Sequence, residues 1–305
     1  MSSKVTLATG PVSWGVDFAD SPGNPPWPQV LDEIAQSGIG ALELGPIGYL
    51  PEQPERLCAE LSSRRLTAVG SFLFEDLHDA AEQERITRLA GRVSTVISAV
   101  GGGTLVLIDR PGDERAATAG RSQDARRLGD GEWQAMLTTI TRVGRIAADH
   151  GLRTAVHPHA GSYIEFPDEI ERLLADCDLP LCLDTGHAAY AGIRPDDALI
   201  AVAPRLAHVH LKDVNRTVLR RIQGGELTFW QAIAADVFCP IGSGIVDFGA
   251  VAAALRRIGY AGFATIEQDR LPGSGAPLDD LRQCIRALRR AGIGTDDPGH
   301  EGGAR

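Results

Sequence analysis

The 305-residue sequence lacks the patterns that would assign it to several large classes of protein. Basic residues are the minority, with 30 Lys and Arg against 40 Asp and Glu. The formal charge of -10 argues against a nucleic-acid groove, because phosphate binding needs clustered cations. No apolar run approaches the ~20 residues that span a bilayer, and the N-terminal MSSKVTLATG lacks the apolar core of a signal peptide. We therefore expect a cytoplasmic protein that binds neither nucleic acid nor membranes.

Paired-cysteine motifs and phosphate-binding glycine motifs are also absent. The five cysteines are scattered, odd in number and without CxxC spacing, so they predict neither a zinc knuckle nor a disulfide framework. Neither GxGxxG nor GxxxxGK(S/T) follows the first apolar run, which disfavours an open doubly wound sheet that binds nucleotides.

Strand-like and helix-like patterns alternate along the whole chain. Apolar runs of strand length occupy 4–15, 41–45, 66–75, 104–109, 154–159, 179–187, 206–213 and 263–269. Helical patterns follow at 27–37, from about 51, and at 82–100, 132–150, 168–175, 195–202, 247–258 and 277–291. Eight strand–helix units predict an α/β fold of the closed (β/α)8 TIM-barrel type, which typically takes ~250 residues.

We expect one barrel domain over residues 1–292, because no linker divides the alternating pattern. An insert at about 214–244 interrupts the pattern after the seventh strand and contains a helical piece at 217–235. The polar stretch after residue 109 is long enough to form a lid. Residues 293–305, rich in glycine and charge, predict a flexible C-terminal tail.

Four of the apolar runs end in residues that bind metals. LPLCLDTGH at 179–187 reads as a buried strand that ends at Asp184, followed by a Thr-Gly turn and His187. LAHVHLKD and FATIEQD similarly carry His210 and Glu267. Since ligands bind at the carboxyl ends of parallel strands, we expect Asp184, His210 and Glu267 to hold a divalent metal. Mn is expected first, with Co, Mg, Fe or Zn as alternatives; the competing interpretation is that each residue caps a helix or strand end.

TAVHPH at 154–159 adds two histidines on one side of its strand, because residues two apart point the same way. Either His157 or His159 could complete the metal sphere, and the other would then face substrate as an acid or base. Two buried, hydrogen-bonded histidines are the alternative. Lys212, two residues past His210, could hold a developing oxyanion, whereas for His208 packing or support of its neighbours is favoured.

Further polar residues near strand ends are candidates for catalysis or substrate contact. We assign catalysis to His159, Lys212, Glu267 and His187, and metal binding to His157, Asp184, His210 and Glu267. The residues expected to contact substrate are Trp14, Glu43, His78, Glu165 and His187. Structural roles remain open for these as well, such as aromatic packing for Trp14 and helix capping for Glu165.

The chain resembles the xylose-isomerase-like barrel superfamily, and within it the inosose (2-keto-myo-inositol) dehydratase group. The resemblance runs from about residue 6 to 291 and is carried by LELG, HPHAGSYIE, LCLDTGHAAYAG, AHVHLKDVN, RRIQGGELTFWQAI and PIGSGIVDF. It implies metal ligands at Asp184, His210 and Glu267. Many members of the superfamily have a Glu on the fifth strand where this chain has His157, and Pro158 interrupts the His run typical of the dehydratase group.

The resemblance implies a metal-dependent lyase of inositol catabolism that removes the proton next to a ketone and expels a hydroxyl through an enediolate. The substrate would be a small keto-sugar or keto-polyol. Reprotonation of the same intermediate would make the protein an isomerase or epimerase. A 3-keto-glycoside lyase and a non-catalytic sugar-binding barrel are further alternatives, and a homo-oligomer is left open. An abasic-site endonuclease is disfavoured by the negative charge.

Overall fold

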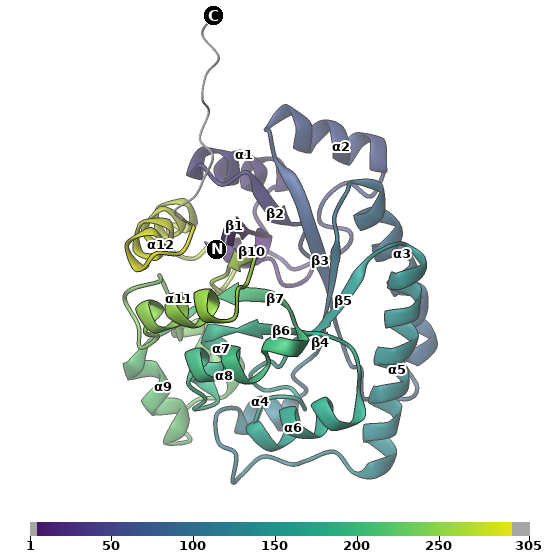
Figure 1. Ribbon diagram of the computed structural model, residues 1–305, viewed down its shortest axis with the longest axis vertical. Helices are drawn as coiled ribbons and strands as arrows, with labels where there is room; N and C mark the ends of the chain where they lie inside the picture. Colours follow the sequence, from purple (N-terminus) through teal and green to yellow (C-terminus); the bar gives the residue numbers. More distant parts are fainter. Residues whose placement is uncertain (1–4, 295–305) are drawn as a thin grey trace, which may run out of the picture.

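The computed structural model describes residues 5–294 and has a closed barrel of eight parallel strands surrounded by helices (Figure 1). Neighbouring strands follow the order β1-β10-β7-β6-β5-β4-β3-β2 around the barrel. Their bounds are β1 Val5–Thr9, β2 Ala41–Glu43, β3 Thr67–Glu75, β4 Thr104–Asp109, β5 Arg153–Val156, β6 Leu181–Asp184, β7 Leu206–Leu211 and β10 Gly262–Ile266. The predicted TIM barrel is therefore confirmed.

The strands are apolar on both faces because both faces are covered. In β4, Leu105 and Leu107 pack into the large cluster shared with the outer helices, whereas Val106 and Ile108 belong to a separate cluster with Phe72 of β3. The alternation of β-strand side chains thus places every second residue inside the barrel. This explains why continuous apolar runs, rather than alternating ones, marked the strands in the sequence.

The outer helices largely occupy the predicted ranges. They are α1 Trp27–Ser37, α2 Pro54–Ser63, α3 Gln83–Ala99, α5 Asp130–Asp149, α6 Pro167–Asp176, α8 Pro195–Ala201, α11 Phe248–Arg257 and α12 Pro277–Ala291. Four of them start with proline and α1 has Pro28 at its second position; the missing N–H of proline costs nothing in the first turn. No helix within residues 5–294 combines the length and apolar character needed to cross a bilayer.

Three local predictions were wrong in detail. The first strand was expected to reach residue 15, but a 3-10 helix over Pro11–Trp14 ends it early. The fifth strand stops at Val156, so the histidines that follow lie in a loop. The turn expected after Asp184 is the first turn of a helix, α7 Thr185–Tyr190, because the Asp184 carboxylate accepts the backbone N–H groups of Gly186 and His187.

The insert after β7 forms a small cap with its own core. We use "the cap" for residues 213–239, which comprise the antiparallel pair β8 Asp213–Val214 and β9 Phe238–Cys239 together with α9 Arg216–Gln223 and α10 Phe229–Ala234. One continuous helix was expected here, but the glycine pair at 224–225 ends α9 and the Thr228 side chain caps α10. Cap side chains such as Phe229 and Phe238 pack against Tyr190 of α7 and Ala116 of α4 (Asp113–Thr118).

The predicted tail at 293–305 lies outside the described residues except for its first two positions, and so does the start of the first predicted strand.

Candidate metal centre and active site

Asp184, His210 and Glu267 converge at the carboxyl ends of three adjacent strands. Asp184 ends β6, His210 lies in β7 and Glu267 follows β10, so the barrel order makes them neighbours. The His210 Nδ1 atom lies 3.2 Å from Glu267 Oε2 and 3.9 Å from Asp184 Oδ2. The His157 Nε2 atom is also 3.9 Å from Asp184 Oδ2, and ligand atoms of His157, Asp184 and His210 lie within 4.8 Å of one another.

These groups fit a divalent cation because two of their atoms lack hydrogen-bond partners. Asp184 Oδ2 and His210 Nδ1 are buried, and neither atom has a hydrogen-bond partner among the described residues. A buried polar atom left without a partner costs ~1–3 kcal/mol, so such atoms usually serve a ligand. Carboxylate oxygen and imidazole nitrogen together suit Mn, Fe, Co or Zn.

Glu43 orients His210 from below. One carboxylate oxygen, Oε1, accepts hydrogen bonds from His208 Nε2 at 2.8 Å, His210 Nε2 at 2.9 Å and Thr265 Oγ1 at 2.6 Å. Burial alone would raise the pKa of Glu43, but the charge of His210 and these hydrogen bonds hold it well below its usual range. With Nε2 engaged, His210 presents Nδ1 to Asp184 and Glu267, as metal-binding histidines supported by a carboxylate do.

Three histidines around the pocket are neutral. Burial lowers the pKa of His157 and His187 well below the usual value and that of His159 to about 4. The Nδ1 atom of His159 lies 2.9 Å from the Ala160 carbonyl oxygen and therefore carries the proton. This leaves Nε2 as an acceptor. The rings of His159 and His187 lie 3.8 Å apart, so His187 supports the position of His159.

Lys212 is a buried cation among carboxylates. Its Nζ atom lies 2.7 Å from Asp269 Oδ1, 3.1 Å from Glu267 Oε2 and 3.3 Å from Asp184 Oδ2. Burial opposes the charged form, but the three carboxylates raise the pKa of Lys212 well above its ordinary value. The ammonium group is therefore charged at neutral pH. This placement agrees with the prediction that Lys212 lies near His210 at the barrel mouth.

Gly186 makes room for Lys212. A Cβ atom at position 186 would lie 2.7 Å from both Cβ and Cγ of Lys212, well inside van der Waals contact. We expect Gly186→Ala to destabilise the fold by ~1–3 kcal/mol through overpacking, measured by urea unfolding. Gly91→Ala in α3, where the added Cβ meets open space, is the matched control and should stabilise slightly. Equal stability of the two variants would contradict this account.

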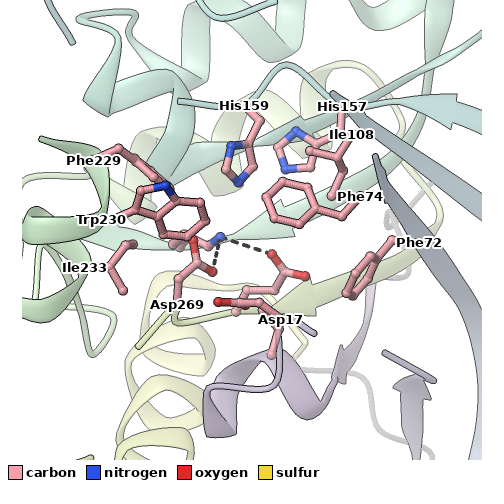
Figure 2. A pocket seen from close by; sticks show the side chains of 13 residues that line it. Asp17, Phe72, Phe74, Ile108, His157, His159, Phe229, Trp230, Ile233 and Asp269 are labelled. Atoms are coloured by element: carbon pink, nitrogen blue, oxygen red, sulfur yellow. Dashed lines mark hydrogen bonds and ion pairs between the residues drawn. The ribbon is translucent and has the colours of Figure 1, made fainter. Parts of the chain in front are cut away.

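The pocket above these groups is lined on its polar side by Asp17, His157, His159, Lys212, Glu267 and Asp269 (Figure 2). Both His157 and His159 lie at its wall, although the loop after β5, and not the expected strand alternation, places them there. Asp184, His187 and His210 lie directly beneath or behind these residues and are not part of the wall.

None of the five residues expected to contact substrate lines this pocket: His187 lies behind its wall, and the other four have structural partners. Trp14 is buried against α1 and donates its indole N–H to Glu33 at 2.6 Å. Glu43 supports His210 from below. The ring of His78 contacts Asp109 at 2.8 Å and packs edge-on against Tyr163. In each case a structural partner claims the polar atom, which matches the alternative weighed for these residues.

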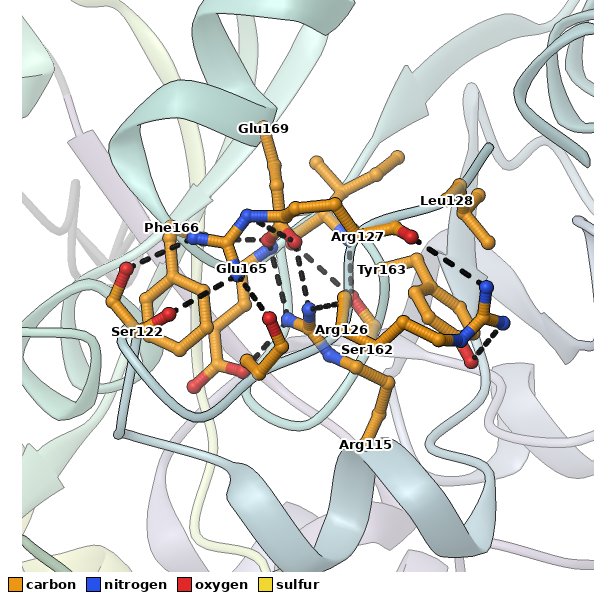
Figure 3. A network of polar contacts seen from close by, with 12 residues as sticks. Arg115, Ser122, Arg126, Arg127, Leu128, Ser162, Tyr163, Glu165, Phe166 and Glu169 are labelled. Carbon is orange, nitrogen blue, oxygen red and sulfur yellow. Dashed lines mark hydrogen bonds and ion pairs between the residues drawn. The ribbon is translucent and has the colours of Figure 1, made fainter. Parts of the chain in front are cut away.

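Glu165, the fourth, belongs to a buried ion cluster that joins Arg115 of α4 to Glu169 of α6 (Figure 3). Its carboxylate accepts the backbone N–H groups of Gly120 at 2.7 Å and Gly161 at 2.9 Å and lies 3.2 Å from Arg115. Arg115 also bridges to Glu169 at 2.7 Å. The cluster ties the expected lid, including α4, to the loop that carries His159.

Asp17 and Asp269 line the pocket but were not predicted. Asp269 stands two residues after Glu267, the same spacing that identified the histidine pairs, so this residue could have been found. Asp17 lies in a loop after β1 and carried no strand-end signal. Burial raises the pKa of Asp17 to about 8, and the nearby charge of Asp269 adds to the effect.

Comparison with known proteins agrees with this architecture. Residues 31–291 match the family model for the xylose isomerase-like TIM barrel. The chain belongs to this family. An inosose dehydratase from Geobacillus kaustophilus is 29% identical over 281 residues, which cover 89% of this chain and 89% of that protein. The chain is accordingly a sugar-modifying enzyme of the dehydratase or isomerase and epimerase type.

Solved structures share the family fold at low sequence identity. A D-allulose 3-epimerase from Methylomonas sp. superimposes with a TM-score of 0.69 and 16% identity, covering 95% of this chain and 98% of that one. The IOLI protein, solved with a bound zinc atom, gives a TM-score of 0.70 and 13% identity, covering 94% of this chain and 98% of that one. At these identities the likeness concerns the fold alone.

Proposed function

We propose that this protein is a metal-dependent dehydratase of a keto-polyol such as 2-keto-myo-inositol. The observation that carries the proposal is the convergence of Asp184, His210 and Glu267 from three adjacent strands, with the buried ammonium of Lys212 beside Asp184 and Glu267. The similarity to an inosose dehydratase over most of both chains supports the substrate class.

Asp184, His210 and Glu267 would hold the metal, and His157 is the nearest fourth ligand because its Nε2 faces Asp184. A bound divalent ion supplies a Lewis acid that polarises the substrate ketone. Mn remains our first expectation, with Co, Mg, Fe or Zn as alternatives. The zinc atom in the IOLI structure supports a divalent ion for the family fold.

The chain's own residues then divide the proton chemistry. His159 has an unprotonated Nε2 at the pocket wall and is positioned to accept the proton next to the ketone. Lys212 stays charged and stabilises the negative charge that develops on the substrate oxygen. Asp17, whose pKa of about 8 keeps it largely protonated at neutral pH, is suited to protonate a departing hydroxyl. His187 holds the ring of His159 in place.

Epimerisation is the second candidate function, and one feature favours it. His157 and His159 lie on one side of the pocket, whereas Asp17 and Asp269 lie on the other (Figure 2). Proton removal on one face and return from the opposite face would invert the carbon next to the ketone. The same residues could therefore serve either outcome, with substrate placement deciding between them.

Mass spectrometry of 2-keto-myo-inositol in heavy water tests the proposal, using chelator-treated protein and the same protein reloaded with Mn. We expect a product lighter by one water only with metal. Deuterium uptake without water loss would instead establish the isomerase or epimerase. Unchanged substrate under both conditions, with metal bound at one equivalent, would overturn the proposal for this polyol.

A further inference from the structure

The active-site pocket has an apolar wall on the side of strands β3 and β4. Phe72, Phe74 and Ile108 line it, and we call them the strand wall. Phe72 and Phe74 point the same way because they alternate along β3. In Figure 2 Phe72, Phe74 and Ile108 lie on the side of the pocket away from Phe229 and Trp230. The strand wall offers no hydrogen-bonding group.

A second apolar wall faces it from the cap. Phe229, Trp230 and Ile233 of α10 line this side, and we call them the helix wall (Figure 2). Phe229 packs edge-on against His159, with ring centroids 5.5 Å apart, so the helix wall directly adjoins the catalytic groups. Trp230 keeps 36% of its surface exposed and, with Leu271, is one of two large apolar residues exposed within residues 5–294.

Little free space remains between the two walls and the polar floor. The cavity measures about 30 Å³, which is room for about two waters and not for a six-membered ring. A ring-sized substrate therefore enters only when side chains that line this space move outward. Those side chains will then lie against whatever part of the substrate points away from the floor.

An unsubstituted keto-polyol matches these walls poorly. It carries a hydroxyl on nearly every carbon, whereas seven of the thirteen side chains that line the pocket are apolar. Each hydroxyl pressed against an apolar wall loses its water without gaining a partner, which costs ~1–3 kcal/mol. Aromatic side chains do stack on the C–H face of a sugar ring. Such stacking would explain one aromatic wall, but it does not explain two walls that also contain Ile108 and Ile233.

We infer that the substrate of this site is a keto-polyol or keto-sugar that carries an apolar substituent, an O-alkyl or O-aryl group, on the side remote from the ketone. The ketone meets Lys212 and the candidate metal ligands, and the substituent lies between the strand wall and the helix wall. This inference rests on the proposed function, since it specifies the substrate class of the same site.

Calorimetric binding of unreactive analogues to the Mn-loaded protein tests the substituent by itself. The two pairs of probes are myo-inositol with its mono-O-benzyl ether, and D-glucose with phenyl β-D-glucopyranoside. We expect the substituted member of at least one pair to bind about tenfold more tightly or better, because the phenyl group leaves water for an apolar pocket. Equal or weaker binding of both substituted probes would overturn the inference.

Two variants locate the effect. Trp230→Ser removes the exposed part of the helix wall and should reduce the affinity ratio within the responding pair at least threefold. Leu271→Ser removes the other exposed apolar side chain, which lies outside the pocket lining, and should leave the ratio unchanged. A ratio that both variants leave unchanged would place the substituent elsewhere and also overturn the inference.

Turnover separates this inference from the proposed function. Deuterium exchange and water loss are measured for 2-keto-myo-inositol and for its O-benzyl ether. Tighter binding of the substituted analogues without exchange in either ketone would sink the proposed function and leave the binding preference standing. Exchange with both ketones, combined with no preference in binding, would support the proposed function and overturn the inferred substituent.

Discussion

Replacing Glu267 by glutamine should lower turnover by ~10³-fold or more while leaving the barrel folded. The amide has the same shape as the carboxylate but no charge, so it weakens the divalent site. It also removes one of the three carboxylates around Lys212, whose Nζ lies 3.1 Å from Glu267 Oε2. Because Glu267 follows β10 at the rim and lies outside the apolar clusters, the core is not disturbed.

Three measurements check this result: the kcat/KM value, the metal content after dialysis, and the circular dichroism spectrum. Glu84→Gln is the matched control, because it removes a surface carboxylate that is 73% exposed and pairs only with Arg142 among described residues. Its effect on turnover should be negligible, as exposed ion pairs contribute little. Wild-type turnover in a folded Glu267→Gln variant would refute the assigned role.

Replacing Arg115 by methionine is expected to lower the free energy of unfolding by ~3–5 kcal/mol. The side chain is fully buried and bonded to Glu165, Glu169 and the Arg126 carbonyl oxygen (Figure 3). Methionine fills a similar volume but leaves Glu165 without its cation, whereas Glu169 keeps only Arg127, whose Nε lies 3.3 Å away. Because the cluster joins α4 to the loop after β5, its loss should also loosen the position of His159.

Urea unfolding, with the midpoint and slope measured separately, gives the comparison. Arg126→Met serves as the control, since Arg126 pairs with Glu114 and Glu132 at partly exposed positions and should cost no more than ~1 kcal/mol. A loss below ~1 kcal/mol for Arg115→Met would contradict this prediction. It would mean that the buried carboxylates find other donors or take up protons, because burial disfavours their charged form.

The barrel could be predicted because its signals are local. The bounds of α1 and α12 agree with the predicted ranges, since a proline in the first turn and a left-handed glycine after the last turn mark both helices in the sequence. Elements whose ends depend on distant partners were missed. The cap was expected to contain one helix but contains two, and the residues expected to form a turn after Asp184 form α7. In both cases a side chain caps the start of the helix that was missed.

The sequence by itself determined the order of strands and helices and the convergence of Asp184, His210 and Glu267. Strand-end positions follow from chain direction, and parallel strands bring their carboxyl ends to one rim whatever the loops do. Only the tertiary structure decided which polar residues face the pocket. Glu43 turns to His208 and His210, Glu165 turns to Arg115, and the cap contributes Trp230 to the wall. These partners are more than 45 residues apart in the chain, so their choice depends on packing that no local pattern records.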